Sequence, residues 1–257
     1  MPIFAKMKKR DLQSLLEDAY ATYAKPGFID LDPIGVAGRF SKKEDIEIAG
    51  FLAATIAWGQ RPTIIKNANR MMELMEEQPH DFVLNHSPKD LERFEGFVHR
   101  TFNHIDLQYF IYRLQKMYQS EGGIEHVFSQ GDSALTRISN FHDSFFNSEH
   151  LSRTRKHVSN PMKGSSAKRL NMYLRWMVRS NKEGIDFGIW NSIPTADLMM
   201  PLDVHTGNIG RHLGLLKRKQ NDWKAVDELT NSLKAFDPVD PVRFDLALFG
   251  IGVNKMI

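Results

Sequence analysis

The chain has 257 residues, of which 42% are hydrophobic and 25% are charged, and these values are ordinary for a soluble globular protein. The length allows one large domain or two small ones, and the absence of cysteine excludes disulfides, thiol catalysis, cysteine zinc sites and iron–sulfur clusters. The net charge of +3 is small, so it indicates a nucleic-acid partner only if basic residues gather on one face.

The sequence also bears on location. No run of about 18 apolar residues is present, so no membrane span is expected. The N-terminal stretch MPIFAKMKKRDLQSLLEDAY lacks a basic segment followed by an apolar core, so we expect no signal peptide. These features together favour a cytoplasmic protein.

The first 160 residues predict helices, because strand signals are scarce and apolar residues recur at steps of three and four. A helix is expected over 9–23, followed by a loop over 27–40. The segment 43–58 is apolar almost all round from Ala49 to Trp58 and predicts a buried core helix. Gly59 to Pro62 should break it, and helices follow over 62–77, 80–92, 105–119 and 132–147. Gly122-Gly123 indicates a turn, and the polar, basic stretch 148–167 indicates a loop.

The last hundred residues give the clearest pattern. Helices are expected over 168–179, 204–213 and 222–235, with an irregular connection over 180–202. Gly214 is a natural left-handed end for the second helix, and Asp240-Pro241 is typical of the start of a final one. The fold class is therefore all-α.

The helix over 168–179 is amphipathic. Lys168, Arg175 and Arg179 share one face, whereas apolar residues such as Leu170 and Leu174 share the other. This pattern fits a plain surface helix, and it also fits a basic stripe beside a cleft.

A turn of small residues precedes this helix, with Pro161 followed by Gly164, Ser165, Ser166 and Ala167. Backbone N–H groups at a helix N-terminus bind anions such as phosphate. The Lys168 ammonium would meet an unfavourable helix dipole there, which favours the neutral, nucleophilic amine. The alternative is a fully solvated lysine without this effect.

Asp203 lies in PLDVHT, directly before the next helix, and its position is that of a helix N-cap. A carboxylate fixed in this way stays ionised and can stabilise a sugar cation, orient a water or assist a nearby amine. His205 could contact a phosphate or lie in the core. No metal site is expected, because the ten histidines are scattered without metal-ligand spacing.

At this point the order of features resembles the helix-hairpin-helix base-excision DNA glycosylases. The stretch PLDVHTGNIGRHLGL is similar to their aspartate turn, FDPVDPVRFDLALFGIG resembles their closing helix, and AATIAWGQ resembles a segment ending in a glutamine that faces DNA. A closer resemblance, over most of the chain, is to an uncharacterised bacterial family known only as a domain of unknown function.

The glycosylase resemblance implies a two-lobed helical bundle around a cleft, within one domain of residues 1–257 whose C-terminal lobe covers about 160–257. It implies that Lys168 attacks the sugar C1′ as a Schiff-base amine, that Asp203 assists departure of a flipped base, and that this base is an oxidised purine. No cofactor or iron–sulfur cluster is implied. The DNA contacts would come from the hairpin and its surroundings: Lys163, Gly164, Ser165, Ser166, Arg175, Arg179, His205, Gln60 and Arg61.

The chain departs from the glycosylase pattern in two places. Of the usual Gly-x-Gly hairpin only Gly164 remains. The spacing from Lys168 to Asp203 is long, so residues 180–192 look like an insertion, and Lys163 is the alternative amine if the alignment shifts.

Other basic and aromatic residues have two interpretations each. Arg61, Lys66 and Arg70 could line DNA or be surface charge, and the run 217–219 could contact phosphate or be a solvated loop. Trp58 and Trp176 could stack on a base or lie in the core. The aromatic-basic stretch GFVHRTF around His99 suggests no particular role.

The sequence therefore leaves three hypotheses open. The first is a DNA glycosylase, with possible lyase activity. The second is a DNA-binding module without catalysis, and the third is a helical protein–protein adaptor. The oligomeric state is left undetermined by the sequence.

Overall fold

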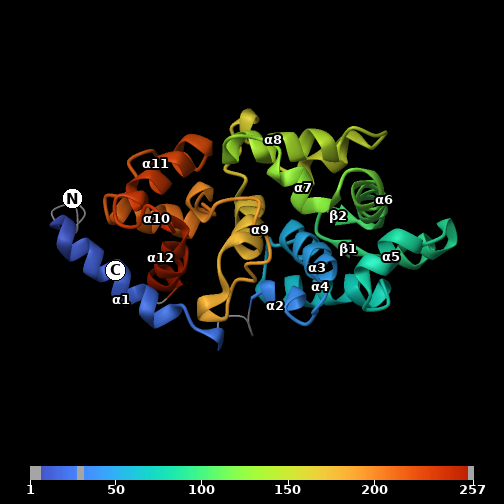
Figure 1. The fold of residues 1–257 in the computed structure, drawn as a ribbon, viewed down its shortest axis with the longest axis horizontal. Coiled ribbons are helices and arrows are strands. Elements are labelled where there is room, and N and C mark those ends of the chain that lie inside the picture. Colours follow the sequence, from blue (N-terminus) through green and yellow to red (C-terminus); the bar gives the residue numbers. More distant parts are fainter. Residues whose placement is uncertain (1–6, 28–31, 254–257) are drawn as a thin grey trace. The chain divides into compact units, whose positions relative to one another are not determined.

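The computed structural model describes residues 7–27 and 32–253, and it is mostly helical (Figure 1). The chain forms two compact units. The first unit combines residues 1–28 with 160–257, and the second contains residues 29–159. We describe each unit by itself.

The first unit joins the two ends of the sequence. Helix α1 (Lys9–Tyr23) packs on α12 (Phe244–Val253), so that the blue and red helices of Figure 1 lie together. Gly250 permits this contact, because a Cβ there would lie 2.0 Å from Cδ2 of Tyr23. The remaining helices of this unit are α9 (Lys168–Val178), α10 (Val204–His212) and α11 (Trp223–Lys234), with short 3-10 segments at Pro161–Lys163, Asn181–Glu183, Thr195–Asp197 and Pro241–Arg243.

The second unit is built around α3 (Lys43–Thr55), whose residues from Ile46 to Thr55 are all buried. Phe51 of this helix packs against Phe110, Phe141 and Phe145 with ring centroids 5.4–5.7 Å away. The other elements are α2 (Ile34–Ala37), α4 (Arg61–Leu74), α5 (Pro79–Asn85), the 3-10 segment Pro88–Phe94, β1 (Val98–His99), β2 (Phe102–Asn103), α6 (His104–Ser120), α7 (Gly123–Ser129), α8 (Ala134–Phe145) and the 3-10 segment Ser152–His157.

Strands β1 and β2 pair as a small antiparallel hairpin. The aromatic-basic stretch GFVHRTF therefore has a structural role, because it forms most of this hairpin. Arg100 forms its turn with φ +55°. His99 is buried, its Nε2 lies 3.1 Å from the backbone oxygen of Trp58, and its Nδ1 lies 2.8 Å from Nδ2 of Asn67. A carbonyl can only accept, so Nε2 carries the proton, and burial lowers the pKa of His99 and keeps it neutral. The stretch therefore joins β1 to the end of α3 and the middle of α4.

The structure differs from the predicted elements at short helices. The stretch 27–40 was expected as a loop but contains α2, and Gly123 begins the seven-residue α7 rather than a plain turn. Gly122 has φ +78°, which is the turn conformation that the glycine pair indicated. Such helices are too short to show a full apolar stripe, so periodicity does not detect them.

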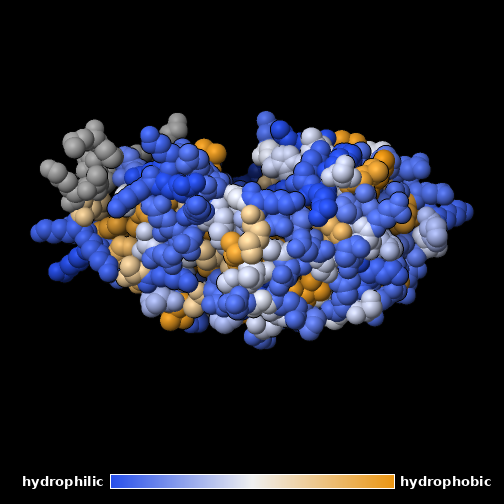
Figure 2. Space-filling model, turned by 90° about the horizontal axis from the view of Figure 1, so that it is seen from above, coloured by the Kyte–Doolittle hydropathy of each residue, from blue (hydrophilic) through white to orange (hydrophobic). Residues whose placement is uncertain are grey.

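On the face shown in Figure 2, hydrophilic residues cover most of the surface of both units and apolar residues form small separate patches. Within residues 7–27 and 32–253, no helix is long and apolar enough to cross a membrane.

Candidate functional site

The hairpin before α9 has the local geometry that the sequence indicates. Gly164 has φ +84° and Ala167 has φ +47°, and α9 begins at Lys168. Inside the hairpin, the Ala167 amide donates to Oγ of Ser165 at 3.1 Å, and Nδ2 of Asn171 donates to the Ser166 carbonyl at 3.0 Å. The hairpin is therefore tied to the first turn of α9, which fixes where the Lys168 side chain begins.

A second set of contacts joins the hairpin to the start of α11. The Trp223 amide donates to the Gly164 carbonyl at 3.3 Å, and Ser165 forms a bridge with Asp222. Asp222 also caps α11 by accepting from the Ala225 amide. The hairpin is consequently bound both to α9 and to α11.

Asp203 is the N-cap of α10, as the sequence predicts. Its Oδ1 accepts from the Thr206 amide at 2.9 Å, and its backbone oxygen accepts from Nδ2 of Asn221 at 3.0 Å. These bonds leave Oδ2 directed to another partner, so the carboxylate is fixed in position with one oxygen available.

That partner is Lys168. Its Nζ lies 3.2 Å from Oδ2 of Asp203, although 35 residues separate the two in sequence. The Lys168 and Asp203 side chains are 34% and 24% exposed, so the pair lies at the surface of the first unit and solutes can reach it. Partial burial disfavours the charged carboxylate, but the Lys168 ammonium and the Thr206 amide outweigh it and hold the pKa of Asp203 below its usual value. The site thus presents an amine beside a carboxylate that is ionised at neutral pH.

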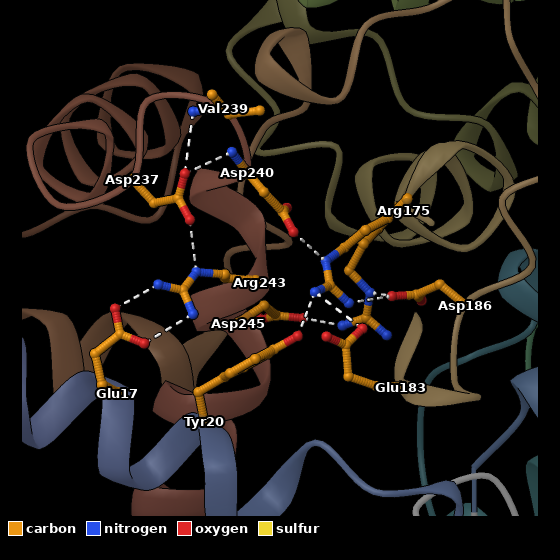
Figure 3. Close-up of polar contacts among 11 residues, drawn as sticks. Glu17, Tyr20, Arg175, Glu183, Asp186, Asp237, Val239, Asp240, Arg243 and Asp245 are labelled. Carbon is orange, nitrogen blue, oxygen red and sulfur yellow. Dashed lines mark hydrogen bonds and ion pairs between the residues drawn. The ribbon is translucent and has the colours of Figure 1, made fainter. Parts of the chain in front are cut away.

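A buried ion-pair network lies next to this pair, and Figure 3 shows most of its members. Arg175 of α9 donates through Nη1 to Oδ2 of Asp245 at 2.5 Å and through Nε to Oδ1 of Asp186 at 3.2 Å. Asp245 lies close enough to Lys168 and Asp203 for their charges to act on it. Burial raises its pKa to about 6, and Asp203 adds to that rise, against the opposing effect of Arg175.

The predicted basic stripe on α9 is wrong for Arg175 and Arg179, because each residue is only 3% exposed. Arg179 donates to Oδ2 of Asp186 at 3.0 Å and to Oδ2 of Asp240 at 2.8 Å, and it also donates to the Tyr20 hydroxyl. Acidic residues distant in sequence satisfy both guanidinium groups, so these arginines are inside the unit and are not available to a DNA surface. Only Lys168 of the stripe remains accessible.

The segment between Lys168 and Asp203 contributes a buried acidic residue to the first unit. Residues 180–192 supply Asp186, which is 1% exposed and bridges Arg175 and Arg179. This segment therefore carries a buried counter-ion for Arg175 and Arg179, while Lys168 and Asp203 still meet. Sequence reasoning missed both partners. Asp186 lies 7 residues after Arg179 but beyond the end of α9, where helical periodicity predicts no pairing, and Asp245 lies 70 residues from Arg175.

The other predicted residues fall into two groups. Lys163, Gly164 and His205 are exposed, and Ser165 and Ser166 are half-buried, around the hairpin and Asp203 in the first unit. The second unit carries Gln60, which is exposed, and Arg61, which is half-buried, at the start of α4. Trp176 is fully buried, as its core interpretation requires, and Trp58 is half-buried between the rings of His99 and His157. Within the described ranges, no group of three or more potential ligands could hold a metal ion.

Comparison with known proteins identifies the family of this chain. The family described as "Protein of unknown function (DUF2400)" matches residues 32–254. The chain belongs to this family. The DUF2400 match contains Lys168, Asp186, Asp203 and Asp245, whereas α1 lies before it. No curated protein and no solved structure matches the chain.

Proposed function

We propose that this DUF2400 protein is a DNA base-excision glycosylase with lyase activity, in which Lys168 is the amine nucleophile and Asp203 is the assisting carboxylate. The observation that carries the proposal is the 3.2 Å approach of Lys168 Nζ to Asp203 Oδ2 at an accessible surface. An amine and an ionised carboxylate in contact are the two groups that displacement at a sugar C1′ requires.

The chemistry assigns one role to each group. The Lys168 amine, after losing a proton, forms a bond to C1′ while the bond from C1′ to the base nitrogen breaks and the base leaves with a proton. The Asp203 carboxylate stabilises positive charge on the sugar during this step. The amine attached to C1′ then loses a proton, the bond from C1′ to the ring oxygen O4′ breaks, and O4′ takes a proton, which leaves a Schiff base on Lys168. The base must leave the duplex stack before the reaction begins.

The hairpin supports the DNA part of the proposal. Its order of proline, glycine, lysine and aspartate turn resembles that of the helix-hairpin-helix glycosylases, in which hairpin amides hold phosphate. The Gly164 and Ala167 amides already donate to Pro161 and Ser165, so any phosphate contact falls to other hairpin amides and to the exposed Lys163. The proposed substrate is thus a DNA backbone at the hairpin and a flipped nucleotide at Lys168.

Borohydride trapping on DNA containing an abasic site tests the amine. The full-length chain should form a covalent adduct, and Lys168→Ala should reduce it by at least about 100-fold. Lys163→Ala decides between the two candidate lysines and should keep the adduct, as should Lys224→Ala, which removes an exposed lysine of α11. An adduct that survives in Lys168→Ala and disappears in Lys163→Ala would move the nucleophile into the hairpin.

A non-catalytic DNA-binding module is the second candidate, and one observation favours it. The Lys168 ammonium is already paired with a carboxylate, an arrangement that also serves merely to join α9 to α10. This candidate predicts DNA binding that weakens steeply with salt but gives no adduct and no base release. Absence of binding even at low salt would remove both DNA candidates and favour the adaptor.

A further inference from the structure

A cavity on the first unit lies apart from the Lys168–Asp203 site, and among the residues that the structure describes every charged one that lines it is a cation. These residues are Lys9 of α1, Arg211 of α10, and Lys217 and Lys219 of the loop after α10. We call this cavity the cationic groove. Its volume is about 870 Å³, within the range of about 300–1,000 Å³ typical of ligand sites.

The floor of the cationic groove is apolar. Leu12 of α1, Leu215 and Leu216 of the loop, and Phe236 after α11 contribute to it. Lys9 lies over the Phe236 ring with Nζ 5.5 Å from the centroid, so its stem follows the floor while its charge stays at the rim. The groove therefore offers apolar contact at its base and positive charge around it.

The loop that carries the two lysines is fixed by its neighbours. Gly214 reverses the chain with φ +74°. The Glu228 carboxylate then accepts from the Lys217 amide at 2.6 Å and from the Arg218 amide at 3.3 Å. The Arg218 side chain pairs with Asp222. Acidic side chains therefore hold both the backbone of the loop, through Glu228, and the Arg218 guanidinium, through Asp222.

The ammonium groups of Lys217 and Lys219 are left without such partners. Both residues are exposed, and in the part of the chain that the structure describes neither ammonium is paired with a carboxylate. Arg211 is different, because its guanidinium donates to the Arg218 carbonyl and to Asn221. The unpaired positive charge of the groove therefore comes from Lys9, Lys217 and Lys219.

We propose that the cationic groove binds an acidic peptide segment of a partner protein, one that inserts bulky apolar side chains between its carboxylates. Carboxylates match the rim, and leucine- or phenylalanine-like side chains match the floor. Nucleic-acid backbone would match the rim alone. The chain's own residues 1–6, MPIFAK, contain no carboxylate and do not supply the complementary charge.

The test uses a fluorescein-labelled peptide, EDLFEDLLED, and the full-length protein. Binding in the micromolar range is expected, and replacing its leucines and phenylalanine by alanine, or its acids by lysine, should weaken binding at least about tenfold. The double variant Lys217→Glu/Lys219→Glu should also weaken binding at least about tenfold, and raising salt from about 0.05 to 0.3 M should weaken it several-fold.

Two matched variants separate the groove from general charge. Lys224→Glu changes an exposed lysine of α11 that does not line the groove and should leave peptide binding unchanged. Ala235→Phe alters the exposed alanine at the lining and should weaken binding without changing any charge. Deletion of residues 1–6 should leave affinity within about twofold.

Several results would overturn the inference. They are no binding at about 100 μM peptide, equal binding of the alanine-substituted peptide, equal loss with Lys224→Glu, or a more than tenfold gain on deleting residues 1–6. Competition by duplex DNA that is lost with Lys217→Glu/Lys219→Glu would assign the groove to nucleic acid instead. None of these results depends on whether Lys168 traps abasic DNA.

Discussion

At the scale of single residues, Asp203 combines two roles that mutation can separate. It caps α10 through the Thr206 amide and pairs with Lys168 through its other oxygen. Asparagine is as good an N-cap as aspartate but carries no charge. Asp203→Asn should therefore change the free energy of unfolding by no more than about 1 kcal/mol, since the pair is partly exposed. If the proposed function holds, it should lower base release at least about 100-fold.

Asp222→Asn is the matched control for this prediction, because Asp222 caps α11 and pairs with Arg218 in the same way. It should have a similar small effect on stability and none on base release. Urea unfolding and single-turnover base release on DNA containing an oxidised purine measure the two quantities. Full activity in Asp203→Asn would remove the carboxylate from the mechanism.

Local signals predicted the cap, the hairpin and the start of α9, whereas a joint role for Lys168 and Asp203 was implied only by the resemblance to the glycosylases. What the sequence could not show was which arginines are accessible. Periodicity places Arg175 and Arg179 on the face of Lys168, but it carries no information about acidic residues arriving from Asp186, Asp240 and Asp245. Long-range ion pairs of this kind depend on the packing of several elements together.

At the scale of elements, α9 depends on the buried Asp186. Removing one member of a buried ion pair leaves uncompensated charge and typically costs about 3–5 kcal/mol. Asp186→Ala would leave Arg175 with Asp245, and Arg179 with Asp240 and Glu183. We therefore expect a loss of about 3 kcal/mol or more in the free energy of unfolding.

Glu183→Ala provides the comparison from the same segment. Its carboxylate lies 3.5 Å from Nη2 of Arg179 and its side chain is 25% exposed, so its removal should cost less than about 1 kcal/mol. Thermal and urea denaturation of both variants give the difference. Equal losses would mean that residues 180–192 stabilise α9 by some means other than the Asp186 bridge.

At the scale of the whole molecule, long apolar helices and their ends were predictable, whereas the joining of residues 1–28 to 160–257 in one unit was not. The stretch from Ala49 to Trp58 is apolar almost all round and was rightly placed in a core, and Gly214 ends α10 as expected. Nothing in residues 9–23 shows that α1 packs on α12 at the other end of the chain. That contact depends on Gly250 meeting Tyr23, which no local pattern reveals.

Each unit contains a buried aspartate, and their pKa values move in opposite directions. In the first unit, burial raises the pKa of Asp245 to about 6. In the second unit, Asp106 is also penalised by burial, but hydrogen bonds from His157, Thr154 and Asn103 lower its pKa to about 2. The unfolded value is about 3.9 for both. The two units should therefore respond differently to pH.

Asp245 makes the folded state bind more protons than the unfolded state between about pH 4 and 6, so its contribution to stability falls as pH rises through that window and is constant above it. Asp106 acts in the opposite sense, because its contribution is complete above about pH 4 and is lost as pH falls toward 2. The Asp245→Asn variant removes this titration, because an amide side chain does not bind or release a proton in this range. Relative to the unaltered chain, Asp245→Asn should gain about 2 kcal/mol in unfolding free energy from pH 4 to pH 6 and only about 0.3 kcal/mol more to pH 7.

Urea unfolding followed by tryptophan fluorescence measures this gain, because Trp176, Trp190 and Trp223 report on the first unit and Trp58 alone on the second. The loss of the Arg175 contact in Asp245→Asn is present at every pH, so only the change with pH reports the titration. Asp106→Asn controls for the other unit, and its difference from the unaltered chain should stay constant between pH 4.5 and 7. A constant difference for Asp245→Asn over the same range would show that Asp245 is already ionised at pH 4.5, and the buried network behind Lys168 would then carry its full negative charge at every pH where DNA chemistry is measured.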